Sequence, residues 1–254
     1  DVYTFKFSYT NDKEATVSFA HTFSNDRVTA KINLYKVDKE TGKAVPQGDA
    51  TLKGAVYGLY AREDIVHPDG ATGTIYKAGE QVASLTTDDK GQASVNGLYL
   101  GKYYVKEITP PTGYLADAEE HDLTCSYEGD MTAEVKRECT SSEQVIKQPF
   151  QIIKAANNGK TDADLLSGAG FTVYLKSSLT KKADGSYDFD SAKPVVSGEN
   201  GATEIFTDEK GYACSIPLPF GSYIVRETTT PHNYKPVDDF EVNITEHHPN
   251  EPQI

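Results

Sequence analysis

Two lysines and two glutamates occupy matching positions in two similar halves of the chain. Each half has a short strand-like run that ends in lysine, at Lys36 or Lys154, and a later Tyr-x-Val-x-Glu run that ends at Glu107 or Glu227. Burial disfavours charge, so it lowers the pKa of a lysine and raises that of a glutamate. A neutral amine is a nucleophile, and a protonated carboxyl can shuttle a proton. With an Asn or Asp between them, the lysine could form an internal amide crosslink.

Strand periodicity predicts where these side chains point. Because side chains alternate between the two faces of a strand, Tyr103, Val105 and Glu107 share one face. Lys36 shares a face with Leu34 in the same way. The apolar neighbours identify both faces as buried. Patterning alone leaves an alternative open, namely a buried Lys–Glu ion pair or a lysine whose ammonium reaches solvent.

The elements that carry these residues repeat along the chain. Residues 52–60 match 166–174, and the turn at 87–91 matches the turn at 207–211. Landmarks that keep their order are typical of tandem repeats. Short runs rich in Val, Ile, Tyr, Phe and Thr alternate with Gly, Pro, Asp and Asn turns. This pattern predicts an all-β fold of tandem antiparallel β-sandwiches.

The repeat also predicts the domain organisation. A chain of 254 residues suits two domains of ordinary size, and we expect unit one at 30–149 and unit two at 150–254. Residues 1–29 contain two strand-like runs, which we expect to be the closing strands of a preceding repeat. Only one strand-like run, at 240–245, follows Tyr234. We therefore expect unit two to be C-terminally truncated, without its last strand.

Composition narrows the function. A net charge of −13 argues against nucleic-acid binding, and the absence of a long apolar run predicts no membrane contact in this segment. Three cysteines are too few for a disulfide framework, so we expect buried free thiols. The pair His247-His248 has no partner at metal-ligand spacing, and no catalytic triad is recognisable. We therefore predict no metal, no cofactor and no enzyme acting on an external substrate.

The two glutamate motifs, with the Pro-x-Gly/Asn-Tyr that follows each, resemble the E-box of Gram-positive pilins. The run Lys-Val-Asp-Lys-Glu-Thr-Gly at 36–42, with Leu-x-Gly-Ala behind it, resembles the opening of Cna-B-type, SpaA-like domains. The resemblance covers both units. It implies tandem transthyretin-like or reverse-immunoglobulin sandwiches in an extracellular, cell-wall-anchored surface protein. It also implies intramolecular Lys–Asn/Asp isopeptide bonds, with Glu107 and Glu227 as catalysts and Lys36 and Lys154 as crosslinking lysines.

The acceptor departs from the family pattern. In the family, an acceptor Asn on the last strand precedes the lysine of the next unit by a short, fairly fixed distance. Asn25 lies 11 positions before Lys36 and resembles such an acceptor, with its own lysine upstream. The same count back from Lys154 reaches Glu143, a poor acceptor because its side chain is longer and usually charged. We expect Lys36 to be unbonded or ion-paired to Glu143, and the acceptor of unit two to lie beyond Ile254.

The resemblance implies a structural stalk or pilin-like segment of a surface adhesin, in which any crosslinking is at most a single autocatalytic turnover. The expected partners are neighbouring repeats of the same chain, and we expect a monomer. The alternative is an adhesin module that recognises a host matrix protein or a glycan. The long insertion at 62–78 is the place that we expect to carry such binding.

Overall fold

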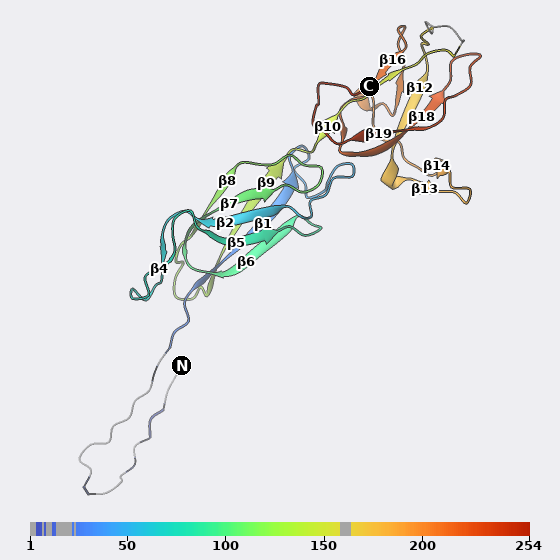
Figure 1. The fold of residues 1–254 in the computed structure, drawn as a ribbon. Coiled ribbons are helices and arrows are strands. Elements are labelled where there is room, and N and C mark those ends of the chain that lie inside the picture. The colour runs from blue at the N-terminus through green and yellow to red at the C-terminus, as the bar shows by residue number, and fades with distance from the viewer. Residues whose placement is uncertain (1–3, 7, 9–11, 14–21, 23, 158–163) are drawn as a thin grey trace.

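The computed structural model describes residues 4–6, 8, 12–13, 22, 24–157 and 164–254. Two sandwiches lie end to end, with unit one following the N-terminal segment and unit two at the C-terminal end (Figure 1). The strand-like runs expected within residues 1–29 fall largely outside the described residues. No helix in the described part of the chain is long and apolar enough to cross a membrane.

Unit one is built from two facing sheets. One has the strand order β6-β1-β9 and the other has the order β5-β2-β7-β8. The strands of the first sheet are β6 (Gln92–Leu98), β1 (Thr29–Asp38) and β9 (Glu134–Glu143). Those of the second are β5 (Gln81–Thr86), β2 (Val56–Ala61), β7 (Gly101–Thr109) and β8 (Glu120–Cys125). The 62–78 insertion carries a small hairpin of β3 (Ile65–Val66) and β4 (Thr74–Tyr76).

The first and last strands of unit one run parallel. β1 and β9 are paired over ten residues, with Lys36 opposite Ser141 and Asp38 opposite Glu143. Most of the other strand pairs are antiparallel, as the sequence predicts. A parallel pair needs a long connection, and here the whole of unit one separates the two strands. The C-terminal ends of β1 and β9 therefore lie side by side.

Unit two repeats this plan. Its main sheet has the order β15-β12-β18-β19, with β15 (Glu204–Phe206), β12 (Gly170–Leu175), β18 (Gly221–Thr229) and β19 (Phe240–Ile244). Facing it, β11 (Gln151–Ile153) pairs with β16 (Tyr212–Cys214), and a parallel bridge joins Phe150 to Gln253. The remaining elements are β10 (Lys147–Gln148), β17 (Leu218–Pro219), β13 (Thr180–Lys181), β14 (Tyr187–Asp188) and the 3-10 turns η1 (Lys176–Ser178) and η2 (Glu199–Gly201).

Alternation of side chains builds the two cores. Every second residue of β1 is buried, from Ala30 to Asp38. On β7 the inward residues are Tyr103, Val105 and Glu107, and the matching residues of β18 are also buried. The strand-forming Val, Ile, Leu and Tyr therefore face the space between the sheets, where burial of apolar area stabilises the fold. The same alternation draws Lys36, Glu107 and Glu143 into the core of unit one. In unit two, Lys154 and Glu227 are buried.

The cysteines differ from the prediction. All three are free, but only Cys125 is buried, whereas Cys139 is half-buried and Cys214 is exposed. Cys214 points outward because its neighbour on β16, Ala213, takes the inward position. The expectation of three buried thiols is therefore confirmed for Cys125, met only in part at Cys139 and wrong for Cys214.

A loop of unit two meets the end of unit one. The N–H of Asp49 donates to the carbonyl of Phe220, and the N–H of Phe220 donates to the carbonyl of Ile146, both at 2.8 Å. The carboxylate of Asp49 accepts hydrogen bonds from the backbone N–H of Ser222 at 3.1 Å and from the hydroxyl of Ser177. Backbone and side-chain bonds therefore hold the two units together at one junction.

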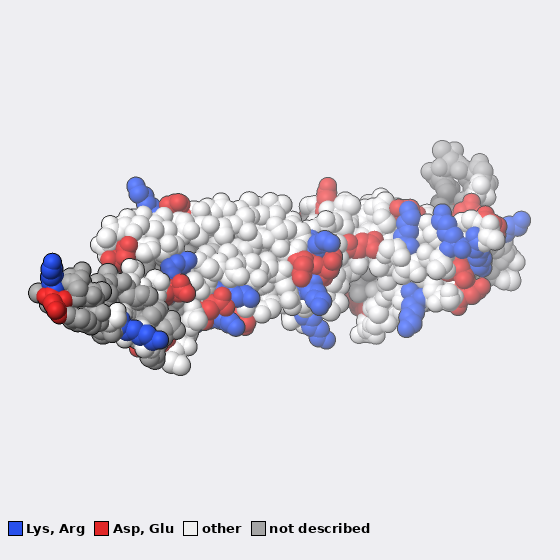
Figure 2. All heavy atoms as spheres, turned by 90° about the horizontal axis from the view of Figure 1, so that it is seen from below, with Lys and Arg blue, Asp and Glu red and all other residues white. Residues whose placement is uncertain are grey.

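Charged groups are dispersed over the surface. Figure 2 shows acidic and basic side chains interspersed along one face, separated by wide areas of other residues. Ion pairs on the surface of the molecule include Arg62–Asp122 and Lys102–Glu63, the second at 3.0 Å. On this face no extended patch of one sign is seen, although the chain as a whole carries a net charge of −13.

Candidate functional site

The end of unit one next to the junction holds a buried lysine and two buried glutamates. Lys36 on β1 forms an ion pair with Oε2 of Glu143 on β9, and both side chains have an exposed fraction of 0%. Neither Lys36 Nζ nor Glu143 Oε2 has a hydrogen-bond partner among the described residues. A buried ammonium with three donors and one ionic contact is poorly satisfied. Together with Glu107, Tyr57 and Ser141, this pair forms the unit-one site.

Two hydroxyl groups hold the other oxygen of Glu143. The hydroxyl of Tyr57 donates to Glu143 Oε1 at 2.7 Å, and the hydroxyl of Ser141 donates to the same atom at 3.1 Å. Burial and the nearby Glu143 charge raise the pKa of Tyr57, so its hydroxyl keeps its proton and remains a donor. The carboxyl group is thus fixed, with Oε1 between two donors and Oε2 facing the lysine.

Glu107 stands beside this pair with a perturbed pKa. Burial raises the pKa of Glu107 to about 7, and the neighbouring Glu143 carboxylate acts in the same direction. The hydrogen bond from the backbone N–H of Asp117, at 2.8 Å to Oε2, and the charge of Lys36 oppose this shift. A carboxyl with a pKa near neutrality can both give and take a proton at physiological pH.

The aromatic ring of Tyr114 covers the ammonium group of Lys36. Its ring centroid lies 4.8 Å from Lys36 Nζ, and its hydroxyl donates to Oδ2 of Asp38 at 3.0 Å. Oδ1 of Asp38 accepts the backbone N–H of Glu40 and of Thr41, at 3.0 and 2.9 Å. Tyr114 is 3% exposed, so water is kept from the lysine on this side.

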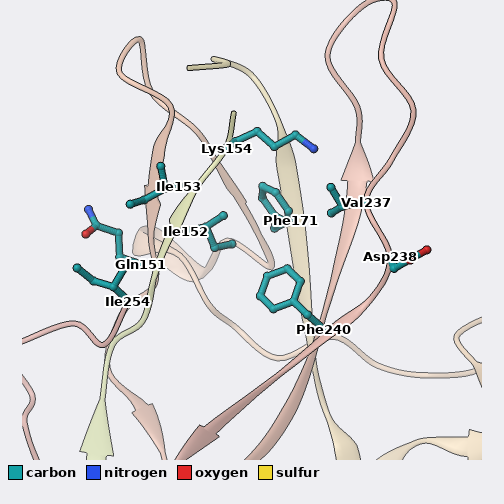
Figure 3. A pocket seen from close by; sticks show the side chains of 9 residues that line it. All are labelled: Gln151, Ile152, Ile153, Lys154, Phe171, Val237, Asp238, Phe240 and Ile254. Atoms are coloured by element: carbon teal, nitrogen blue, oxygen red, sulfur yellow. The ribbon is translucent and has the colours of Figure 1, made fainter. Parts of the chain in front are cut away.

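Unit two has a simpler arrangement. Lys154 Nζ donates to Oε2 of Glu227 at 2.8 Å, and the same oxygen accepts the backbone N–H of Val237 at 2.8 Å. Figure 3 shows Lys154 extending above Phe171 toward Val237, along a groove of about 390 Å³. The side chain of Lys154 is 7% exposed and that of Glu227 is 0% exposed. Here the lysine pairs directly with the E-box glutamate.

The structure places the sequence-predicted residues as follows. Lys36, Glu107 and Glu143 meet in unit one, and Lys154 meets Glu227 in unit two. Asn25 is exposed and lies in the extended segment that leads into β1.

Sequence reasoning missed Tyr57 and Ser141. A signal for Tyr57 does exist, because the matching position of unit two is Phe171. A hydroxyl present in only one of two repeats suggests a polar partner in that repeat. Ser141 lies two residues before Glu143 on the same strand, so the two share a face.

One group of potential metal ligands was also not foreseen. Asp117, Glu119 and His121 bring ligand atoms within 4.8 Å of one another. His121 Nε2 lies 3.8 Å from Asp117 Oδ2, a long contact between two half-buried side chains, and Glu119 is exposed. This cluster therefore supports no metal assignment.

Comparison with known proteins identifies the fold. The family model of the SpaA prealbumin-like fold domain matches residues 30–138 and 149–253. The Bacillus anthracis TIE protein is 24% identical, with a TM-score of 0.55 over 87% of this chain and 32% of its own. The present chain thus spans about a third of the length of that protein. No curated protein matches the chain.

Two pilin structures are also similar in part. A minor pilin of Streptococcus agalactiae is 18% identical over 85% of this chain and 91% of its own, with a TM-score of 0.32. The shaft pilin of Lactobacillus rhamnosus GG is 20% identical over 86% and 94%, with a TM-score of 0.29. These scores are too low to support an argument. The match of the family model to both units is sufficient, and the chain belongs to the SpaA-like, Cna-B-type family of prealbumin-like repeat domains of Gram-positive surface proteins.

Proposed function

We propose that this chain is a stalk segment of an extracellular, cell-wall-anchored surface protein, and that a tie between its first and last strands resists extension. The observation that carries the proposal is the contact between Lys36 on β1 and Glu143 on β9. Tension along the chain enters unit one through β1 and leaves through β9. Because these strands are parallel, tension shears all their hydrogen bonds together. A bond between them transfers the load past the rest of the unit.

We propose that the tie is an amide between Lys36 Nζ and Cδ of Glu143. Proton transfer within the ion pair gives an amine and a carboxylic acid, and the amine attacks Cδ. The developing negative charge falls on Oε1, where the hydroxyls of Tyr57 and Ser141 donate. The C–N bond forms, the C–Oε2 bond breaks, and Oε2 leaves as water. The product has no buried charge pair, which relieves the poorly satisfied ammonium.

Glu107 is suited to move the protons in this step. It can accept the second proton from the attacking nitrogen and deliver it to the departing Oε2, so its own protonation state is restored. Its pKa of about 7 matches this double role. The reaction consumes its own side chains and occurs once, so the chain is not a turnover enzyme. In unit two, Glu227 occupies the equivalent position beside Lys154.

Single-molecule force extension tests the load-bearing role. With the amide in place, the 108 residues from Lys36 to Glu143 do not extend, and about 380 Å of contour length is missing. Unit two unfolds to its full length in the same trace and serves as an internal reference. Lys36→Met should restore the missing length. Full extension of both units in the unmodified protein would contradict the proposal.

A second candidate function is ligand binding by the 62–78 insertion. The hairpin β3–β4 borders a pocket of about 220 Å³, lined by Arg27, Val28, Val66, Pro68, Tyr99, Leu100 and Tyr127. Aromatic rings with a nearby guanidinium suit a glycan or a host matrix protein. Binding to a glycan or matrix-protein array that disappears when residues 64–76 are replaced by a short turn would support it. Equal binding by both proteins would rule it out.

A further inference from the structure

The junction between the units lies next to the unit-one site, and residues at the junction pack beside it. Phe220 of unit two packs against a cluster at the end of unit one. The members of this junction cluster are Ala50, Leu52, Tyr114 and Val145. Phe220 is fixed there by its backbone bonds to Asp49 and Ile146, both at 2.8 Å. A side chain of unit two therefore takes part in the packing of unit one.

Tyr114 connects this cluster to the buried lysine. One part of Tyr114 belongs to the junction cluster, and its ring lies over Lys36 Nζ. Val145 comes two residues after Glu143 and has no exposed surface. The cluster that Phe220 contacts therefore includes the ring over Lys36 Nζ and a buried residue two positions after Glu143.

The equivalent end of unit two lacks such a cover in the described residues. Tyr234 is the repeat counterpart of Tyr114, and it is 46% exposed, compared with 3% for Tyr114. The preceding residue is Gly113 in unit one and Asn233 in unit two, and both have positive φ, of 83° and 69°. A Cβ at Gly113 would lie 2.8 Å from the Phe220 ring and 2.6 Å from Cβ of Ala50. Gly113 therefore fits a tight interface, whereas Asn233 shows that the same backbone turn tolerates a side chain where the packing is open.

We infer that unit two closes the unit-one site, and that Phe220 is the positioning residue that seals Lys36 and Glu143 from water. The inference deepens the proposed stalk function, because it makes the tie in one unit depend on docking of the next. Water at the site would stabilise the separate ammonium and carboxylate and would oppose loss of water from the pair. A unit-one site that becomes reactive only after unit two docks would link crosslinking to completed folding of both units.

Acylation of Lys36 by a water-soluble amine reagent, mapped by peptide mass spectrometry on the native protein, tests the inference. In the unmodified protein we expect Lys36 to be protected, whether it is an amide or a sealed ion pair. Phe220→Ala should raise the modified fraction of Lys36 about tenfold or more, which corresponds to about 1.4 kcal/mol of lost protection. Phe206→Ala is the matched control, since Phe206 lies in unit two at 53% exposure on β15. It should leave Lys36 protected.

A second variant tests the inference independently, in case Phe220→Ala does not fold. Asp49→Ala removes the acceptor for Ser222 N–H and for the Ser177 hydroxyl, and it leaves the junction cluster in place. It should raise Lys36 acylation by a smaller factor, while hydrogen exchange in β12 and β18 reports that unit two stays folded. The inference is overturned if Lys36 stays protected in both variants.

Intact mass separates this result from the amide proposal. If the unmodified protein has its full calculated mass, the amide is wrong, yet the acylation comparison still decides whether Phe220 seals the site. If the unmodified protein lacks one water but Phe220→Ala forms the amide to the same extent and at the same rate, the amide holds and the sealing role fails.

Discussion

The two units place the same lysine and the same E-box glutamate on equivalent strands, yet the two lysines have different partners. Lys36 faces Glu143 on the parallel last strand, whereas Lys154 donates to Glu227. The two lysines differ in partner because the last strand of unit one, β9, carries a carboxyl group at this position. Where β9 supplies a second carboxyl, Lys36 pairs with that carboxyl rather than with the E-box Glu107. Burial and the neighbouring Glu143 raise the pKa of Glu107 to about 7. An acid partner for the lysine frees the second carboxyl to act as a proton carrier.

The surroundings of each pair follow from this difference. In unit one the core aromatic is Tyr57, whose hydroxyl binds Glu143, and in unit two it is Phe171. Unit one is closed by Tyr114 and Phe220, whereas Lys154 borders a groove. The closed site therefore carries the polar groups that a carboxyl acceptor needs, and the more open one does not.

The largest expected effect comes from removing the lysines. Lys36→Met removes the link between β1 and β9, whether amide or ion pair, and leaves the Glu143 carboxylate buried without a charge partner. This should lower the free energy of unfolding of unit one by about 3–5 kcal/mol or more. Lys154→Met should lower the free energy of unfolding of unit two by a smaller amount, because the groove beside Lys154 gives water a route toward the unpaired Glu227. Urea unfolding followed by hydrogen exchange in each unit measures both. Equal losses in the two units would show that the closure of unit one has no energetic role.

The Tyr57 hydroxyl should have the next largest effect. Tyr57→Phe reproduces the residue of unit two and leaves Glu143 Oε1 with Ser141 as its one hydroxyl donor, at a cost of about 1–3 kcal/mol. Tyr103→Phe is the control, because its hydroxyl donates to the neutral carbonyl of Tyr99 at 2.6 Å. It should cost about 0.5–1.5 kcal/mol. If Tyr57→Phe proves no more costly than Tyr103→Phe, the hydroxyl has no special link to the carboxylate.

Glu107 predicts a pH dependence with a definite sign. Its pKa rises from 4.5 to about 7 on folding, so the folded state keeps a proton that the unfolded state loses in this range. The contribution of this group to stability therefore falls as pH rises from 4.5 to 7. Glu107→Gln should flatten this part of the profile of unit one. The measurement is the free energy of unfolding at several pH values, and identical slopes in both proteins would refute the assignment.

The smallest effect is expected at the rim of the junction. Lys147 contacts Oε2 of Glu40, with side-chain exposures of 19% and 34%. Exposed ion pairs contribute about 0–1 kcal/mol, so Lys147→Gln should barely change stability or the protection of Lys36. If Lys147→Gln exposed Lys36 to acylation as much as Phe220→Ala is expected to, charge rather than the apolar cluster would hold the junction.

Most of the fold could be predicted from strand periodicity and from the internal repeat. They predicted an all-β chain of two tandem sandwiches, and the inward positions of Tyr103, Val105 and Glu107 follow from a period of two. The parallel pairing of β1 with β9 has no local sequence signal, because it depends on how the intervening strands are arranged. Family spacing pointed to Glu143, and it is the parallel register that brings this residue to Lys36.

The parts of the site that escaped prediction depend on long-range contacts. Tyr57 reaches Glu143 across 86 positions, and Phe220 belongs to the other unit. A comparison of the two repeats does indicate these contacts, since Tyr57 and Gly113 stand at the positions that Phe171 and Asn233 occupy in unit two. Each substitution marks a contact that exists in one unit and not in the other.

The intact mass of the denatured protein, by high-resolution mass spectrometry, tests the Lys36–Glu143 crosslink most directly. We predict a deficit of one water, with a single branched peptide that joins Lys36 to Glu143 and an unmodified Lys154. Lys36→Met should return to its calculated mass. The full calculated mass in the unmodified protein would contradict the crosslink and leave an ion pair in its place. A deficit of one ammonia would contradict it as well, because it would require an amide side chain as the acceptor.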